Sequence, residues 1–135
     1  MQAIVDERGN PLAISIDSAG VGECQMVADT FRSYPFSNPK YVVGDKGYDS
    51  DRLQQDLFSD QDIFLLSPRR KNRKARHPKW KLVKKYYRKR YVVERFFAWF
   101  KSYRKVSDRF SVKWANYVGL CHLACAIVLL KRVFG

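Results

Sequence analysis

The chain has 135 residues, which suffices for one domain with a buried core, and 46% of them are hydrophobic, which excludes a disordered polypeptide. Its 26 Lys and Arg residues against 13 Asp and Glu residues leave a formal net charge of +13. This surplus predicts a polyanionic partner, nucleic acid before a membrane, although a solvated basic surface or ribosomal-type RNA binding would also produce it.

The first half of the chain, residues 1–66, is acidic and has the pattern of an α/β arrangement, with 11 acidic and 5 basic residues. Strands are expected at 2–5 and 12–16, joined by a turn at 7–11, and further strands at 41–44 and 63–66. Helices are expected at 23–34, which Pro35 ends, and at 51–59, which Asp49 or Ser50 caps.

The second half is basic: residues 69–105 contain 17 basic residues and a single acid, Glu94. Residues 69–79 have no periodicity, which predicts a loop that only a partner would order. A long helix is expected from about Lys81 to Val106, with an aromatic core face, and a last helix from 114 to 133. The change in charge divides the chain into two functional halves without requiring two domains.

The three cysteines, Cys24, Cys121 and Cys125, are an odd number without dense spacing, which argues against a disulfide framework and fits a reducing cytoplasm. Cys121-His122-x-x-Cys125 allows a metal site, but no fourth ligand is near, so burial between helices is favoured. The first residues do not resemble a signal peptide. The apolar run 118–130 is short for a membrane span and predicts a buried helix.

Glu94 is the only acidic residue between Asp62 and Asp108. On a single helix it would share one face with Tyr87, Arg90 and Lys101. The alternative is a surface ion pair between Arg90 and Glu94, which contributes only a few tenths of a kcal/mol, so stability gives this acid little purpose.

Asp45 follows a strand and lies between Gly44 and Gly47. Active sites of α/β proteins tend to lie at the carboxyl ends of strands, although a turn or capping role is equally compatible. Together, Asp45 and Glu94 suggest phosphodiester chemistry on two divalent metals roughly 4 Å apart, which carboxylates bind well.

Tyr87-x2-Arg90-x3-Glu94-x6-Lys101 resembles the Tyr–Arg–Glu–Lys signature of a large class of bacterial insertion-sequence transposases with a DDE catalytic domain. Residues 84–97 are similar to that family's motif as a whole. Residues 44–50 resemble the segment around its second Asp, and residues 3–12 the hairpin before it. The resemblance covers nearly the whole chain, in the right order.

This resemblance implies an RNase H-like mixed sheet with flanking helices, of which residues 1–135 are the C-terminal part, with 1–66 forming the sheet half, 69–79 the basic loop and 81–135 two long helices. It implies DNA transposition by cleavage and strand transfer with Mg²⁺, or Mn²⁺, at a two-metal site. Asp45 and Glu94 match metal-binding, catalytic carboxylates, and Tyr87, Arg90 and Lys101 match DNA-binding residues. The implied partners are double-stranded transposon ends and a second copy in a paired-end complex, in the cytoplasm at the nucleoid, without a membrane.

The chain departs from the family in one carboxylate. The family has a third carboxylate, an Asp on the first central strand, which lies upstream of the hairpin with which this chain starts. Asp6 lies at a turn and Asp17 after the second hairpin strand, so neither is a good substitute. We therefore expect a sheet without its first central strand and activity that needs upstream sequence. The chain would then be either one part of a product joined by frameshifting or a degenerate fragment. A non-catalytic nucleic-acid-binding remnant and an RNase H-like nuclease unrelated to transposition are the rival interpretations.

Overall fold

The computed structural model describes residues 1–17, 22–32, 39–107 and 113–135, which form two compact units. The first unit consists of Met1, Ala3–Ile16 and Tyr91–Gly135, and the second of Gln2 and Asp17–Arg90. Each unit mixes strands and helices, which confirms an α/β protein in the coarse sense.

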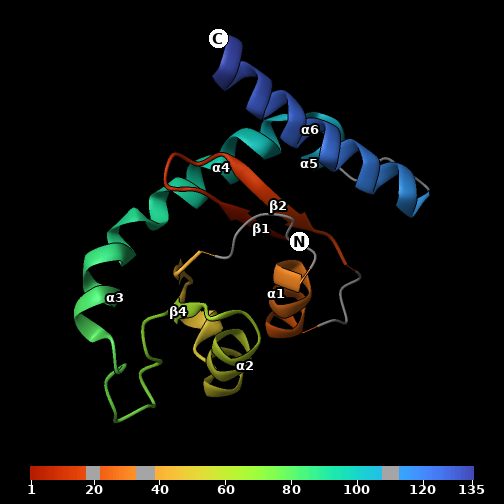
Figure 1. Cartoon of the computed structure of the whole chain (residues 1–135). Helices are drawn as coiled ribbons and strands as arrows, with labels where there is room; N and C mark the ends of the chain where they lie inside the picture. Colours follow the sequence, from red (N-terminus) through yellow and green to blue (C-terminus); the bar gives the residue numbers. More distant parts are fainter. Residues whose placement is uncertain (18–21, 33–38, 108–112) are drawn as a thin grey trace. The chain divides into compact units, whose positions relative to one another are not determined.

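The first unit combines a hairpin with C-terminal helices (Figure 1). Strands β1 (Gln2–Val5) and β2 (Pro11–Ser15) pair with each other, as the sequence predicted. The helices are α4 (Tyr91–Ser102), the short α5 (Arg104–Ser107) and α6 (Trp114–Phe134). Gly9 in the hairpin turn has φ +85°, and a Cβ there would lie 3.0 Å from Cγ1 of Val92, so both conformation and space favour glycine.

The core of the first unit lies where α4, α5 and α6 meet the hairpin. Phe96 and Phe100 are fully inaccessible and one turn apart on α4, with ring centroids 5.5 Å apart. They pack with Val106, Cys121, Ala124, Cys125 and Val128. The predicted burial of the two helical cysteines is thereby confirmed, and it raises the pKa of the Cys125 thiol to about 11.

Helix α6 is buried on one face only, which corrects the expectation of a buried helix. Cys121, Ala124 and Val128 line the core, whereas Leu123 is 56% and Leu130 53% exposed. By length and composition α6 also meets the requirements of a membrane span, but the core helix of a soluble protein meets them equally. The apolar run therefore has a buried face and an exposed face, and hydrophobicity alone does not distinguish the residues of the two faces.

The second unit is built around two parallel strands, β3 (Tyr41–Val43) and β4 (Phe64–Leu66), joined by helix α2 (Asp51–Gln61). Tyr41 pairs with Phe64 and Val43 with Leu66. Helix α1 (Glu23–Arg32) packs against α2, and α3 (Trp80–Tyr87) packs against both strands (Figure 1). The end of the helix expected at 23–34 falls partly on residues 33 and 34, outside the described residues.

The start of α2 was predicted correctly. The Ser50 hydroxyl accepts a hydrogen bond from the Leu53 N–H at 3.3 Å, which caps the helix. Leu53 and Leu57 lie one turn apart on the buried face of α2. With Ile63 and Leu66 they belong to the core, and all four are at most 3% exposed.

The expected helix from Lys81 to Val106 is not continuous. A 3-10 turn, η2 (Arg88–Arg90), separates α3 from α4, and α5 begins anew at Arg104. Five of the seven residues 84–90 are Lys or Arg, and like charges one turn apart repel each other. Periodicity predicted the helical segments, but the crowded charge weakens the α-helix at this point.

The four strands form two separate two-stranded sheets among the described residues. The hairpin belongs to the first unit and the parallel pair to the second. A two-stranded sheet is marginal unless helices cover it, and in each unit the helices named above do so.

Candidate functional site

Asp45 lies at the carboxyl end of β3, where the sequence predicted it. Its carboxylate Oδ1 accepts a hydrogen bond from the Gly47 N–H at 2.6 Å and so caps the 3-10 turn η1 (Lys46–Tyr48). Gly44 just before it leaves room for Tyr48, whose ring would lie 3.0 Å from a Cβ at that position. The side chain of Asp45 is thus exposed but held by the backbone of its own turn.

Glu94 and Lys101 lie on α4, seven residues apart and both exposed. Seven residues are nearly two turns, so these two members of the signature share a helix face. Glu94 belongs to the first unit and Asp45 to the second, so the structure describes the two carboxylates in separate units and not as one site.

Tyr87 ends α3 and Arg90 ends η2, in the second unit. The Arg90 guanidinium lies over the Tyr87 ring, 5.3 Å from its centroid, a cation–π contact. The expectation that all four signature residues lie on one uninterrupted α-helix is therefore wrong, because η2 comes between the two pairs.

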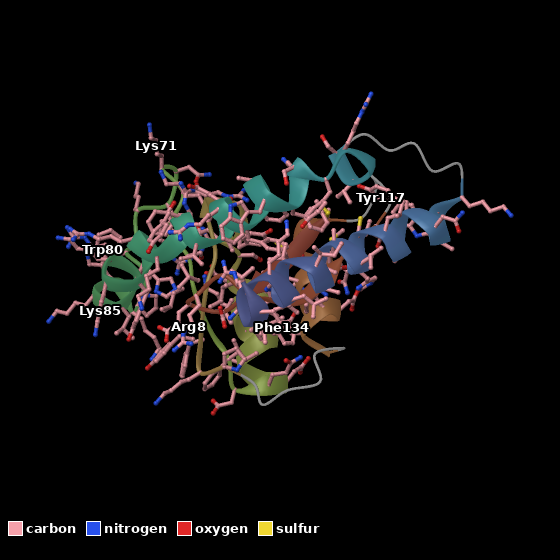
Figure 2. All side chains as sticks on the ribbon, turned by 90° about the horizontal axis from the view of Figure 1, so that it is seen from above. Arg8, Lys71, Trp80, Lys85, Tyr117 and Phe134 are labelled. Atoms are coloured by element: carbon pink, nitrogen blue, oxygen red, sulfur yellow. The ribbon has the colours of Figure 1, made fainter. Side chains whose placement is uncertain are left out.

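The basic residues of α3 gather on one side of the helix. An open surface pocket is lined by Lys81, Lys84, Lys85 and Arg88, all exposed, and Lys85 extends away from the ribbon (Figure 2). Lysines three and four residues apart on a helix destabilise it slightly, and the first turn of α3 contains no acid to offset them. A surface with this cost fits an anionic partner, and sequence reasoning did not single it out from the rest of the basic stretch.

The segment 69–79, expected to be ordered only by a partner, is instead tied to acids of its own unit. Arg69 Nη1 lies 2.9 Å from Asp49 Oδ1 and 2.7 Å from Asp51 Oδ1, and Arg73 Nη1 lies 2.7 Å from Asp51 Oδ2. Hydrogen bonds from Arg69 and Arg73 lower the pKa of Asp51. The sequence signal that could have indicated these pairs is the acidic Asp49-x-Asp51 spacing together with Arg69 and Arg73 in the loop.

Asp6 and Asp17 were weak candidates for a third carboxylate. The Asp6 carboxylate accepts hydrogen bonds from the N–H groups of Arg8 at 2.9 Å and Asn10 at 2.8 Å, and from the Asn10 amide at 2.7 Å. Partial burial acts to raise the pKa of Asp6, but these bonds together lower it. Asp6 is engaged in the turn, and Asp17 is exposed beyond β2.

No group of three or more His, Cys, Asp or Glu side chains gathers for a metal within the described ranges. The donor chemistry fits Mg²⁺ at Asp45, because its carboxylate is exposed and one of its oxygens is held by the Gly47 N–H, and carboxylate oxygens are hard ligands that suit Mg²⁺. Glu94 offers a second exposed carboxylate.

Comparison with known proteins identifies a family. The model of the transposase DDE domain matches residues 1–129. A protein of Brucella ovis named as a transposase for insertion sequence element IS6501 is 27% identical over 134 residues, covering 97% of each chain.

A protein of Burkholderia cepacia named as a transposase for insertion sequence element IS402 is 28% identical over 134 residues. That match covers 93% of the chain but 59% of the relative, so the chain spans little more than half of that protein. No solved structure matches the chain.

Proposed function

Because the chain belongs to the transposase DDE domain family, we propose that it is the C-terminal part of a catalytic domain that cuts and joins DNA at transposon ends with divalent metal ions. The observation that carries this is the family match over residues 1–129, within which Asp45 follows a parallel strand and Glu94 lies on a basic segment. In this proposal Asp45 and Glu94 are metal ligands and catalytic residues, and Tyr87, Arg90 and Lys101 contact DNA phosphates.

The proposed metals are Mg²⁺ ions, with Mn²⁺ as a substitute, at a two-metal site. When bound, such ions activate an attacking oxygen and stabilise the leaving one. The contribution of the chain is position: the Gly47 N–H orients the Asp45 carboxylate, and the Tyr87 ring orients the Arg90 guanidinium for a phosphate.

The proposed fold is RNase H-like, completed by a central strand that carries the third carboxylate. Each described sheet has two strands, the smallest number that can form a sheet, and sheets of three or more strands are far more stable. A strand from upstream sequence would supply both the missing pairing and the missing ligand.

The proposal extends to the setting: a cytoplasmic protein at the nucleoid, acting as a dimer on two paired transposon ends. The support is the family membership and the net charge of +13, which draws the protein to DNA.

The proposal is tested with Glu94→Ala in the full-length protein, incubated with Mg²⁺ and a plasmid that carries the transposon ends. Cutting is expected to fall to the level seen without metal, because the metal loses a ligand, while gel-shift affinity for the same DNA persists. The matched control is Glu7→Ala, an exposed glutamate of the hairpin turn, which should leave cutting unchanged. Undiminished cutting by Glu94→Ala contradicts the assignment.

A second candidate, a nucleic-acid-binding protein without catalysis, is favoured by the basic face of α3. It predicts DNA binding with a steep salt dependence and little sequence preference. Metal-dependent nicking of DNA by this chain, lost in Asp45→Asn, excludes it.

A further inference from the structure

Asp49 is a buried carboxylate in the turn that follows Asp45, with a side chain that is 0% exposed. Its Oδ1 pairs with Arg69 Nη1 at 2.9 Å, and its Oδ2 accepts a hydrogen bond from the Arg70 N–H at 2.8 Å. Arg73 Nε lies 3.3 Å from the same Oδ2. Arg69, Arg70 and Arg73 thus all contact one carboxylate, which holds the start of the basic segment against the turn.

The side chain of Arg70 extends this connection to the turn that Asp45 caps. Its Nε donates to the Lys46 carbonyl at 3.2 Å and its Nη2 donates to the Gly47 carbonyl at 2.9 Å. Both carbonyls belong to η1, the turn that Asp45 caps. The peptide group between Lys46 and Gly47 therefore accepts from Arg70 Nε on its carbonyl, while its N–H donates to the Asp45 carboxylate at 2.6 Å.

Stability alone does not account for this arrangement. Burying a carboxylate is costly, and replacing a buried ion pair by apolar side chains often leaves a protein as stable or more so. What the cluster supplies is geometry, because Arg70 bridges two carbonyls with the fixed fork of a guanidinium, which lysine does not reproduce.

We propose that Arg70, anchored by Asp49, is a positioning residue that holds the Asp45 turn in its metal-binding orientation and links it to the start of the basic segment. This inference rests on the proposed function, since it takes Asp45 as a metal ligand. Groups that orient a ligand from behind commonly change metal affinity when they are substituted.

The experiment measures Mn²⁺ binding to the chain by electron paramagnetic resonance titration, for wild type and four variants. Arg70→Lys keeps the charge but loses the two-carbonyl bridge, and it is expected to weaken Mn²⁺ binding on the order of tenfold. Arg52→Lys is the matched control, because that side chain is 91% exposed and pairs with Asp56 on its own helix. Asp49→Asn is expected to behave as Arg70→Lys does, and Asp45→Asn removes the ligand itself.

The outcomes separate the two proposals. If Asp45→Asn abolishes Mn²⁺ binding but Arg70→Lys and Asp49→Asn bind as wild type does, the positioning role is overturned and the proposed function stands. If Asp45→Asn binds Mn²⁺ undiminished, both are overturned.

A measurement on wild type guards against variants that do not fold. The Arg70 Nε–H donates to the Lys46 carbonyl at 3.2 Å, and its NMR resonance serves as the probe. Mg²⁺ titration is expected to shift this resonance together with the Gly47 amide, and an unmoved Arg70 signal while the Gly47 amide shifts overturns the proposal.

Discussion

Asp45 and Asp49 are four residues apart and meet opposite environments. Asp45 is exposed and bonded to its own turn, while Asp49 is buried among arginines that lie 20 and more residues away in the chain. The place of Asp45 could be predicted, since a strand followed by Gly-Asp is a local pattern. The burial of Asp49 could not, because its partners are in a segment without periodicity that resembled a free loop.

Removing the Asp49 carboxylate is expected to be costly. Asp49→Ala removes the buried acid that Arg69 and Arg73 share and leaves them the exposed Asp51, and breaking a buried pair from one side costs about 3–5 kcal/mol of unfolding free energy. Urea denaturation measures it. The control, Asp56→Ala, removes a half-exposed acid whose pair with Arg52 spans 3.8 Å, and it should cost less than about 1 kcal/mol. Equal losses in the two variants would contradict the buried role of Asp49.

His77 makes stability depend on pH. Burial lowers the pKa of His77 below 6.5, with Arg69 acting in the same direction and a backbone contact to Leu65 and the charge of Asp49 opposing it. Between the folded and unfolded pKa values the unfolded chain binds more protons, so stability falls as pH drops below about 6.5. Urea midpoints from pH 7.5 to 5 should decline in wild type.

His77→Gln should flatten that decline, and His122→Gln is the control because that side chain is exposed on α6. Asp6 and Asp51, whose pKa values are lowered, act in a lower window, below their ordinary value of 3.8. A decline in His77→Gln as steep as in wild type would assign the effect to other groups.

At the scale of elements, the sequence predicted where helices and strands occur better than how far they run. The four strands and helix α2 appear close to their predicted positions because turns, caps and alternation are local. The break at η2 was missed, because the aromatic periodicity of Phe96 and Phe100 extends the pattern while charge repulsion at 84–90 acts against it. Periodicity also does not show that only one face of α6 is covered.

The two faces of the first unit's helices should respond differently to truncation. Phe100→Ala empties a fully buried site, and such substitutions cost about 3–5 kcal/mol. Leu130→Ala shortens a side chain that is 53% exposed, and its effect should stay within about 0.5 kcal/mol. Thermal unfolding by circular dichroism compares the two. A large loss in Leu130→Ala would mean that the outer face of α6 is covered in solution.

At the scale of the whole molecule, the basic side chains behind the net charge of +13 fall into two groups. Arg69, Arg70 and Arg73 hold the Asp45–Asp51 segment together and are engaged with acids or carbonyls. Lys81 and Lys84 on α3, and Arg88 directly after it, form no ion pair with the described residues of their own unit. Net charge therefore overstates the basic surface that is proposed to contact DNA, and this distinction required the structure.

The salt dependence of DNA binding tests this division. Each phosphate contact contributes about 0.9 to the slope of log affinity against log salt, so substituting both Lys84 and Lys85 by Gln should reduce the slope by about 1.8. Fluorescence anisotropy with a short duplex between 50 and 200 mM salt, a range that separates such slopes, measures it.

The matched control replaces Lys40 and Lys113 by Gln, which removes the same charge from exposed positions outside α3. If both double variants lower the slope equally, the protein meets DNA through its overall charge, and the α3 face has no special part. If only the α3 variant does, the DNA path runs along α3 toward Tyr87 and Arg90, because these residues follow directly on the chain and in the same unit.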